Sequence, residues 1–144
     1  MKRKTVTILC WLAVAVCMGV IFYFSAQPAV VSQAVSDEFA FAFNLPFGSF
    51  IIRKAAHFLE FAGLSVLIFN ALHSTFGRFR PFVSFIITAL YALTDEIHQI
   101  FVEGRACRFF DWVVDCSGAA AALIFICLII YISGKKKRRC SDDR

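Results

Sequence analysis

Charged residues are scarce in this 144-residue chain, in which 17% of the residues are charged and 60% are hydrophobic. Soluble domains usually carry about 25% charged residues, so this composition excludes a water-soluble enzyme. The six cysteines form no Cys-x-x-Cys pair and half of them lie inside apolar runs, which excludes a disulfide framework. The net charge of +5 is concentrated beside apolar runs, so the sequence predicts no nucleic-acid partner.

Long apolar runs dominate the sequence instead, and each approaches the ~20 residues that cross a bilayer as a helix. We expect an all-α integral membrane four-helix bundle in which residues 1–144 form one domain. The expected spans cover residues 5–24, 54–73, 81–102 and 112–132, and a basic tail follows at 134–144. The third span is the least apolar, because its last turns are so polar that a hydropathy window alone would discard it.

The basic residues predict the orientation of these spans. Eleven of the 15 lysines and arginines lie at the two termini or between the second and third spans. By the positive-inside rule this side is cytoplasmic, so both termini are expected in the cytoplasm. The other four lie on the outer side and need a different explanation: Arg53, Lys54, Arg105 and Arg108.

The connection from Gln27 to Ile52 is the longest one between spans. Within it Val35, Phe39 and Phe43 follow i, i+4 spacing, which is typical of a helix with one apolar side. We expect a short interfacial helix here, with Ser36 as its N-cap.

Polar residues gather at the outer ends of all four expected spans, whereas the cytoplasmic halves are nearly pure hydrocarbon. Ionisable groups inside a span are costly and normally face the interior of a bundle or a water-filled cavity. We therefore expect one polar layer in the outer leaflet, whose candidate ligand-binding residues are Gln27, Lys54, His57, Glu60, Gln99, Arg105, Arg108, Asp111 and Asp115. Gly118 and Ala122 continue the stripe of Asp111 and Asp115 along the fourth span, and their spacing predicts a close approach of another helix.

Three chemical roles are open for this layer. Asp95, Glu96 and His98 are candidate catalytic acids and bases, because burial shifts the pKa of such groups. Lys54, Arg105 and Arg108 could hold a phosphate or carboxylate, and the alternative is that they reach up to the lipid head groups. A divalent metal is a third role, with candidate ligands His57, Glu60, Asp95 and His98, although the sequence requires no cofactor and helix-to-helix ion pairing explains the same residues.

Several segments resemble the VanZ family. They are Arg53–Phe61 with its Lys-x-x-His-Phe, Leu93–Val102 with its Thr-Asp-Glu-x-His-Gln, Arg105, Asp111–Gly118, and the Ser-x-Gln at residues 25–27. Where the family commonly carries Asn, this chain has Asp115. The resemblance implies a small multi-pass protein of the bacterial cytoplasmic membrane, in a family named for a member that confers teicoplanin resistance.

From these residues and this resemblance, the main hypothesis is recognition, with or without modification, of an amphiphile at the outer polar layer. The candidates are a lipid, a lipid-linked wall intermediate or a lipidated glycopeptide antibiotic, with a role in glycopeptide or envelope-stress tolerance. The first alternative is a metal-dependent intramembrane hydrolase. The second is an oligomeric transporter or pore, although the apolar inner halves argue against a polar route through a monomer. The oligomeric state stays open.

Overall fold

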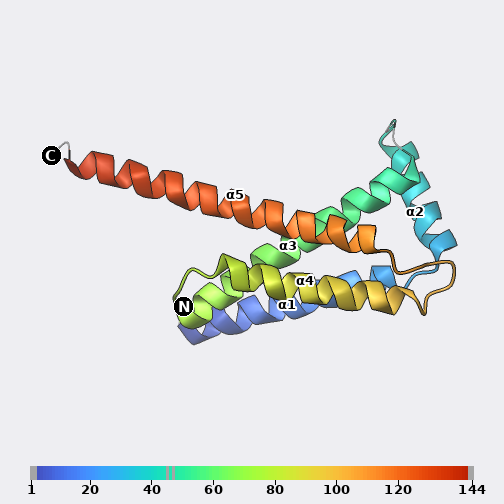
Figure 1. The fold of residues 1–144 in the computed structure, drawn as a ribbon, viewed down its shortest axis with the longest axis horizontal. Helices are drawn as coiled ribbons and strands as arrows, with labels where there is room; N and C mark the ends of the chain where they lie inside the picture. The colour runs from blue at the N-terminus through green and yellow to red at the C-terminus, as the bar shows by residue number, and fades with distance from the viewer. Residues whose placement is uncertain (1–2, 45, 47, 143–144) are drawn as a thin grey trace.

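The computed structural model describes residues 3–44, 46 and 48–142, and side chains as far as residue 135. Within these ranges every regular element is a helix, and the chain order is α1 (Arg3–Ser25), α2 (Ala29–Ala42), α3 (Ser49–Phe76), α4 (Pro81–Gln99) and α5 (Phe109–Asp142). The all-α prediction is therefore confirmed, with a fifth helix added to the four long ones (Figure 1).

Helix α3 holds the fold together, because it contacts each of the other four helices. Its face carrying Phe61, Leu64 and Ile68 forms the centre of the hydrophobic core, and these three side chains are at most 1% exposed. Val14 and Ile21 of α1 pack against this face. The interior is thus small, and most of the remaining apolar side chains point outward, as expected of a protein surrounded by lipid.

Three of the described helices are long and apolar enough to cross a membrane, namely α1, α3 and the Phe109–Lys135 part of α5. They coincide with three of the predicted spans. Helix α4 is not among them, because Asp95, Glu96, His98 and Gln99 occupy its final turns. Its 19 residues still give a length of about 28 Å, and it packs on α3 and α5.

The predicted third span was wrong at its outer end, since the helix ends at Gln99 rather than at residue 102. Residues 100–108 form an irregular connection in which Gly104 has a φ of 72°. A side chain is strained in this left-handed conformation, so a glycine suits the point where the chain turns away from the helix axis. After this turn, the following residues fold back over the ends of α1 and α4.

The predicted interfacial helix exists as α2, but Ser36 is not its N-cap. Pro28 precedes the first turn, and Ser36 lies in the middle of the helix, where its Oγ donates a hydrogen bond to the carbonyl of Ser32 at 2.9 Å. A mid-helix serine commonly satisfies its hydroxyl in this way. The helix begins two residues after Gln27, earlier than the capping prediction placed it.

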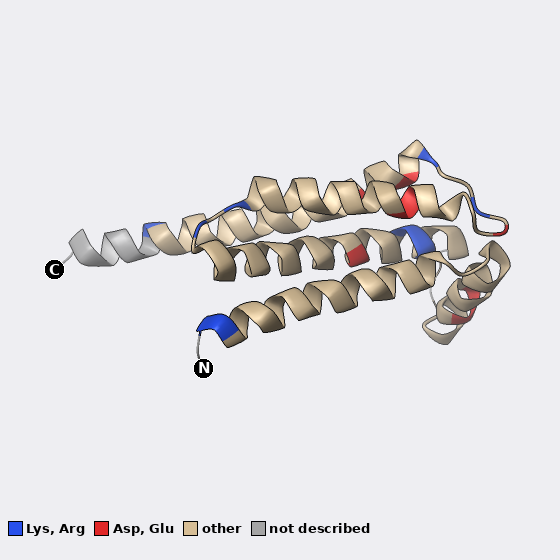
Figure 2. Cartoon of the chain, turned by 90° about the horizontal axis from the view of Figure 1, so that it is seen from below, with Lys and Arg blue, Asp and Glu red and all other residues tan. Residues whose placement is uncertain are grey.

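Both chain ends lie at one end of the bundle, and α2 lies at the other (Figure 2). We call these the termini end and the α2 end. Arg3 begins α1, and its guanidinium group lies beside Gly77 in the connection from α3 to α4, which also holds Arg78 and Arg80. Figure 2 shows basic residues at the termini end and acidic residues in the half toward α2. The side chains of the basic run at 136–139 lie outside the described residues.

Candidate functional site

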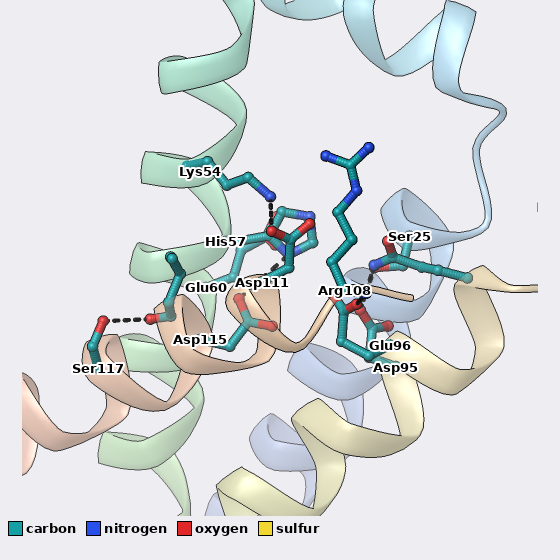
Figure 3. A network of polar contacts seen from close by, with 12 residues as sticks. Ser25, Lys54, His57, Glu60, Asp95, Glu96, Arg108, Asp111, Asp115 and Ser117 are labelled. Atoms are coloured by element: carbon teal, nitrogen blue, oxygen red, sulfur yellow. Dashed lines mark hydrogen bonds and ion pairs between the residues drawn. The ribbon is translucent and has the colours of Figure 1, made fainter. Parts of the chain in front are cut away.

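The predicted polar residues do gather at the α2 end, but they divide into separate contacts (Figure 3). The first contact joins α3 to α5 through an ion pair between Lys54 Nζ and Asp111 Oδ1, whose side chains are 17% and 19% exposed. Lys54 Nζ also lies 5.3 Å from the centre of the Phe50 ring. Both charges are thus already partnered within the protein.

One helical turn further along α3, His57 faces two carboxylates. Its Nδ1 lies 3.7 Å from Oδ1 of Asp115 and 4.0 Å from Oε2 of Glu60. Asp115 is only 1% exposed. The position of Asp115 follows from the close contact of α5 with α3, where the Cα of Gly118 lies so near the backbone of Phe58 that a side chain would collide with it. The close approach predicted from Gly118 is therefore confirmed.

Asp95 joins α4 to α1. Its Oδ2 accepts hydrogen bonds from Ser25 Oγ at 2.7 Å and from Gln99 Nε2 at 3.1 Å. Asp95 is 2% exposed, and among the described residues its Oδ1 has no hydrogen-bond partner. These contacts serve the packing of two helices and leave the carboxylate out of reach of solvent.

Glu96 accepts a hydrogen bond at 3.0 Å from the backbone N–H of Arg108, and so holds the start of α5 against α4. The Arg108 side chain is exposed and points away from this contact in Figure 3. The structure therefore uses the backbone of Arg108 where the sequence suggested its guanidinium group.

Arg105 binds the end of α1. Its Nε donates to the carbonyl of Gln27 at 2.9 Å and its guanidinium nitrogen donates to the carbonyl of Phe24 at 3.2 Å, which satisfies carbonyls that the helix end leaves free. Burial, and after it the positive charge of Arg53, lowers the pKa of Arg105.

His98 has other contacts than the two carboxylates with which it was grouped. Its ring stacks on Phe22 with centroids 4.3 Å apart, and its buried Nε2 has no hydrogen-bond partner in the described chain. Asp95, Glu96 and His98 thus have three different sets of partners. The proposed metal ligands are divided in the same way, and among the described residues no three histidine, cysteine or acidic side chains form a group that could hold a metal ion.

A cleft of about 710 Å³ opens between α1, α2 and the first half of α3. Apolar side chains cover most of its wall, including Tyr23, Phe24, Val31, Val35, Phe39, Ile52 and Leu59. Besides the hydroxyl groups of Tyr23, Ser32 and Ser36, five lining residues carry ionisable or amide side chains that can bind a ligand: Gln27, Arg53, His57, Glu60 and Arg105. Four of these five were predicted as ligand-binding residues, whereas Lys54, Asp95 and Asp111 are not among the residues that line the cleft.

Arg53 is the cleft residue that the sequence prediction omitted from the site. The sequence did contain an indication of its role, because Arg53 is one of four basic residues on the side where the positive-inside rule expects few. The prediction named its sequence neighbour Lys54 instead. Only the structure shows that Arg53, and not Lys54, lines the cleft.

Comparison with known proteins identifies a family. The model of the VanZ/LLP1 family matches residues 10–131, which include α1 to α4 and most of α5. No curated protein matches the chain, and no solved structure does. The matched range contains every residue that lines the cleft.

Proposed function

Because the chain belongs to the VanZ/LLP1 family, and is a membrane protein of the VanZ type, we propose that it binds an anionic amphiphile in the cleft beside α2. The ligand class is a phospholipid, a lipid-linked wall intermediate or a lipidated glycopeptide. The family assignment agrees with the resemblance of the Lys-x-x-His-Phe and Thr-Asp-Glu-x-His-Gln segments.

The proposal includes an orientation. The termini end carries most of the basic residues and faces the cytoplasm, so the α2 end lies in the outer leaflet. Helix α4 completes the four-helix bundle across the bilayer. In this orientation the cleft is open to lipids and wall intermediates of the cell envelope, and binding there contributes to tolerance of glycopeptides or of envelope stress.

The cleft itself is the observation that carries the proposal. Its volume lies within the range of about 300–1,000 Å³ that is typical of small-molecule sites, and such sites combine apolar walls with a few convergent polar groups. Apolar walls suit acyl chains. Arg53 and Arg105 both line the cleft, and guanidinium groups bind phosphate or carboxylate through paired hydrogen bonds.

The structure changes the residues to which we assign anion binding. Lys54 is paired with Asp111, and the Arg108 side chain points away from the polar contacts, so neither is a good candidate. Arg53 has no such structural task in the described contacts. Arg105 holds α1 as well as lining the cleft, so its substitution would disturb the fold and the site together.

Arg53→Gln therefore tests the proposal. The purified protein is immobilised, and its retention of labelled phosphatidylglycerol is compared with that of phosphatidylcholine. Loss of one charge-assisted hydrogen bond, worth about 1.5–3 kcal/mol, is expected to weaken retention of the anionic lipid about 10- to 100-fold. Arg78→Gln, an exposed arginine at the termini end, is the matched control and should leave retention unchanged.

Equal retention of the two lipids by the unaltered protein would contradict anion recognition. A second readout is teicoplanin tolerance of cells that express each variant at equal membrane level. No observation favours the metal-dependent hydrolase, since the described residues hold no suitable ligand group. None favours a transporter or pore either.

A further inference from the structure

His57 lies between the cleft and the buried carboxylate of Asp115. This arrangement is typical of a catalytic base as well as of a ligand-binding residue. The residue lines the cleft, yet its Nδ1 is buried and faces Asp115 at 3.7 Å. With Nδ1 turned to α5, Nε2 is the ring nitrogen left for the cleft. A carboxylate opposite Nδ1 favours the tautomer that carries its proton there, which leaves the lone pair on Nε2.

Asp115 is suited to this orienting task. It is 1% exposed, and among the described residues neither of its oxygens has a hydrogen-bond partner, although buried carboxylates nearly always have one. The His57 ring is the basic group that faces it. The distance of 3.7 Å is long for a hydrogen bond, but such contacts commonly shorten when substrate binds. Glu60 lies at 4.0 Å and its side chain is 27% exposed, which makes it the weaker partner.

The positions of Arg53 and His57 along α3 indicate which bond of a bound phospholipid would lie beside His57. Arg53 and His57 are one turn apart on α3, with Arg53 about 6 Å nearer to the α2 end. In a glycerophospholipid the acyl ester bonds lie one glycerol unit deeper than the phosphate. A phosphate held by Arg53 therefore places an acyl ester at the level of His57, with its chain against Val35, Phe39 and Leu59.

We propose that the cleft is a deacylation site, in which His57 acts as the catalytic general base on an anionic glycerophospholipid and Asp115 is the positioning residue. This inference rests on the proposed binding of an anionic amphiphile in the same cleft. It moves the acid–base role from Asp95, Glu96 and His98 to His57, which was predicted as a ligand-binding residue and as a candidate metal ligand.

The reaction consumes one water. Nε2 of His57 takes a proton from the water, and the water oxygen forms a bond with the ester carbonyl carbon. The positive charge of Arg105 on the cleft wall stabilises the negative charge that develops on the carbonyl oxygen. The bond between this carbon and the glycerol oxygen then breaks, and the glycerol oxygen receives the proton from His57. The products are a fatty acid and a lysophospholipid.

The experiment uses the full chain reconstituted into vesicles of 1-palmitoyl-2-oleoyl-phosphatidylglycerol, with released fatty acid and lysolipid measured by mass spectrometry. His57→Gln removes the base and is expected to lower the release at least about 100-fold. His73→Gln is the matched control, because it makes the same substitution on the same helix at the termini end, and it should keep full activity. Asp115→Asn keeps the size of the side chain and should lower kcat more than it changes KM.

Retention of phosphatidylglycerol by the immobilised variants shows whether they still fold and bind. Release that depends on His57, with retention intact, supports the inference. If the unaltered protein retains phosphatidylglycerol but releases no fatty acid, the deacylation proposal is overturned and the binding proposal remains. Release of glycerol phosphate instead of fatty acid has the same two consequences. Equal release from His57→Gln and the unaltered protein also overturns it. Absence of retention by the unaltered protein refutes the proposed function itself.

Discussion

At the scale of single residues, the polar layer shows how a membrane protein accommodates charges that the bilayer disfavours. Lys54 meets Asp111, Glu96 meets a backbone N–H, and Asp95 meets a hydroxyl and an amide. Each contact joins different helices or the loop that connects them, except that of Asp95 with Gln99, which lies within α4. The sequence predicted that polar residues gather at one end of the helices, because costly side chains must face the interior. It could not predict the partners, since several carboxylates and cations of similar depth allow many pairings.

The ion pair of Lys54 and Asp111 gives a prediction at this scale. Lys54→Met and Asp111→Asn each leave the other group without its partner, and each is expected to lower stability by about 1–3 kcal/mol. The double variant should lose less than the sum of the two, because it leaves no unpaired charge. Thermal unfolding of the four proteins in the same detergent measures the coupling. Strict additivity of the two losses would mean that the pair contributes nothing to stability.

At the scale of elements, the contact between α3 and α5 positions the site. Ser65 Oγ on α3 donates to the carbonyl of Ala119 on α5 at 3.3 Å, and Gly118 lies against the backbone of Phe58. This contact brings Asp115 beside His57. The small residues at Gly118 and Ala122 indicated a close approach from the sequence alone. The sequence did not reveal which helix would make it, because α1 and α4 were equally available.

Gly118→Ala tests this contact. The added methyl group meets backbone atoms of Phe58, which cannot move as a side chain would, so α3 and α5 must separate. We expect a loss of about 1–3 kcal/mol, measured as a lower midpoint in thermal unfolding. Gly63→Ala on α3 is the matched control, since no atom lies within 4 Å of the added carbon, and it should be neutral or stabilising. Equal midpoints for both variants would count against the close contact.

At the scale of the whole molecule, the two ends of the bundle differ in chemistry. Basic residues occur at the termini end, where α1 begins and α3 connects to α4, and the cleft and the paired charges lie toward α2. Such an asymmetry favours one direction across the membrane, because basic loops are preferentially retained in the cytoplasm. In the proposed orientation the cleft faces outward, where the proposed ligands are found.

Cysteine labelling tests this direction. In a variant whose other cysteines are replaced by serine, exposed Cys107 between α4 and α5 should react with a membrane-impermeant maleimide in intact cells. In a cysteine-free protein, the cysteine from Arg78→Cys should react only after the membrane is opened. The reverse pattern would place the cleft on the cytoplasmic side and remove the envelope ligands from the proposal.

The sequence by itself determined the helical class, three of the four predicted spans, the short helix after Gln27 and the gathering of polar residues toward one end of the helices. These follow from local composition and periodicity, because the bilayer admits few backbone structures and penalises charge according to depth. Only the tertiary structure decided which charges pair, that α2 lies over α3 to form a cleft, and that Arg53 rather than Lys54 lines it. Those outcomes depend on how helices distant in sequence pack and on the direction in which each helix face points. The different partners of His98, Asp95 and Glu96 have the same cause, since neighbours on one helix are directed toward different sides.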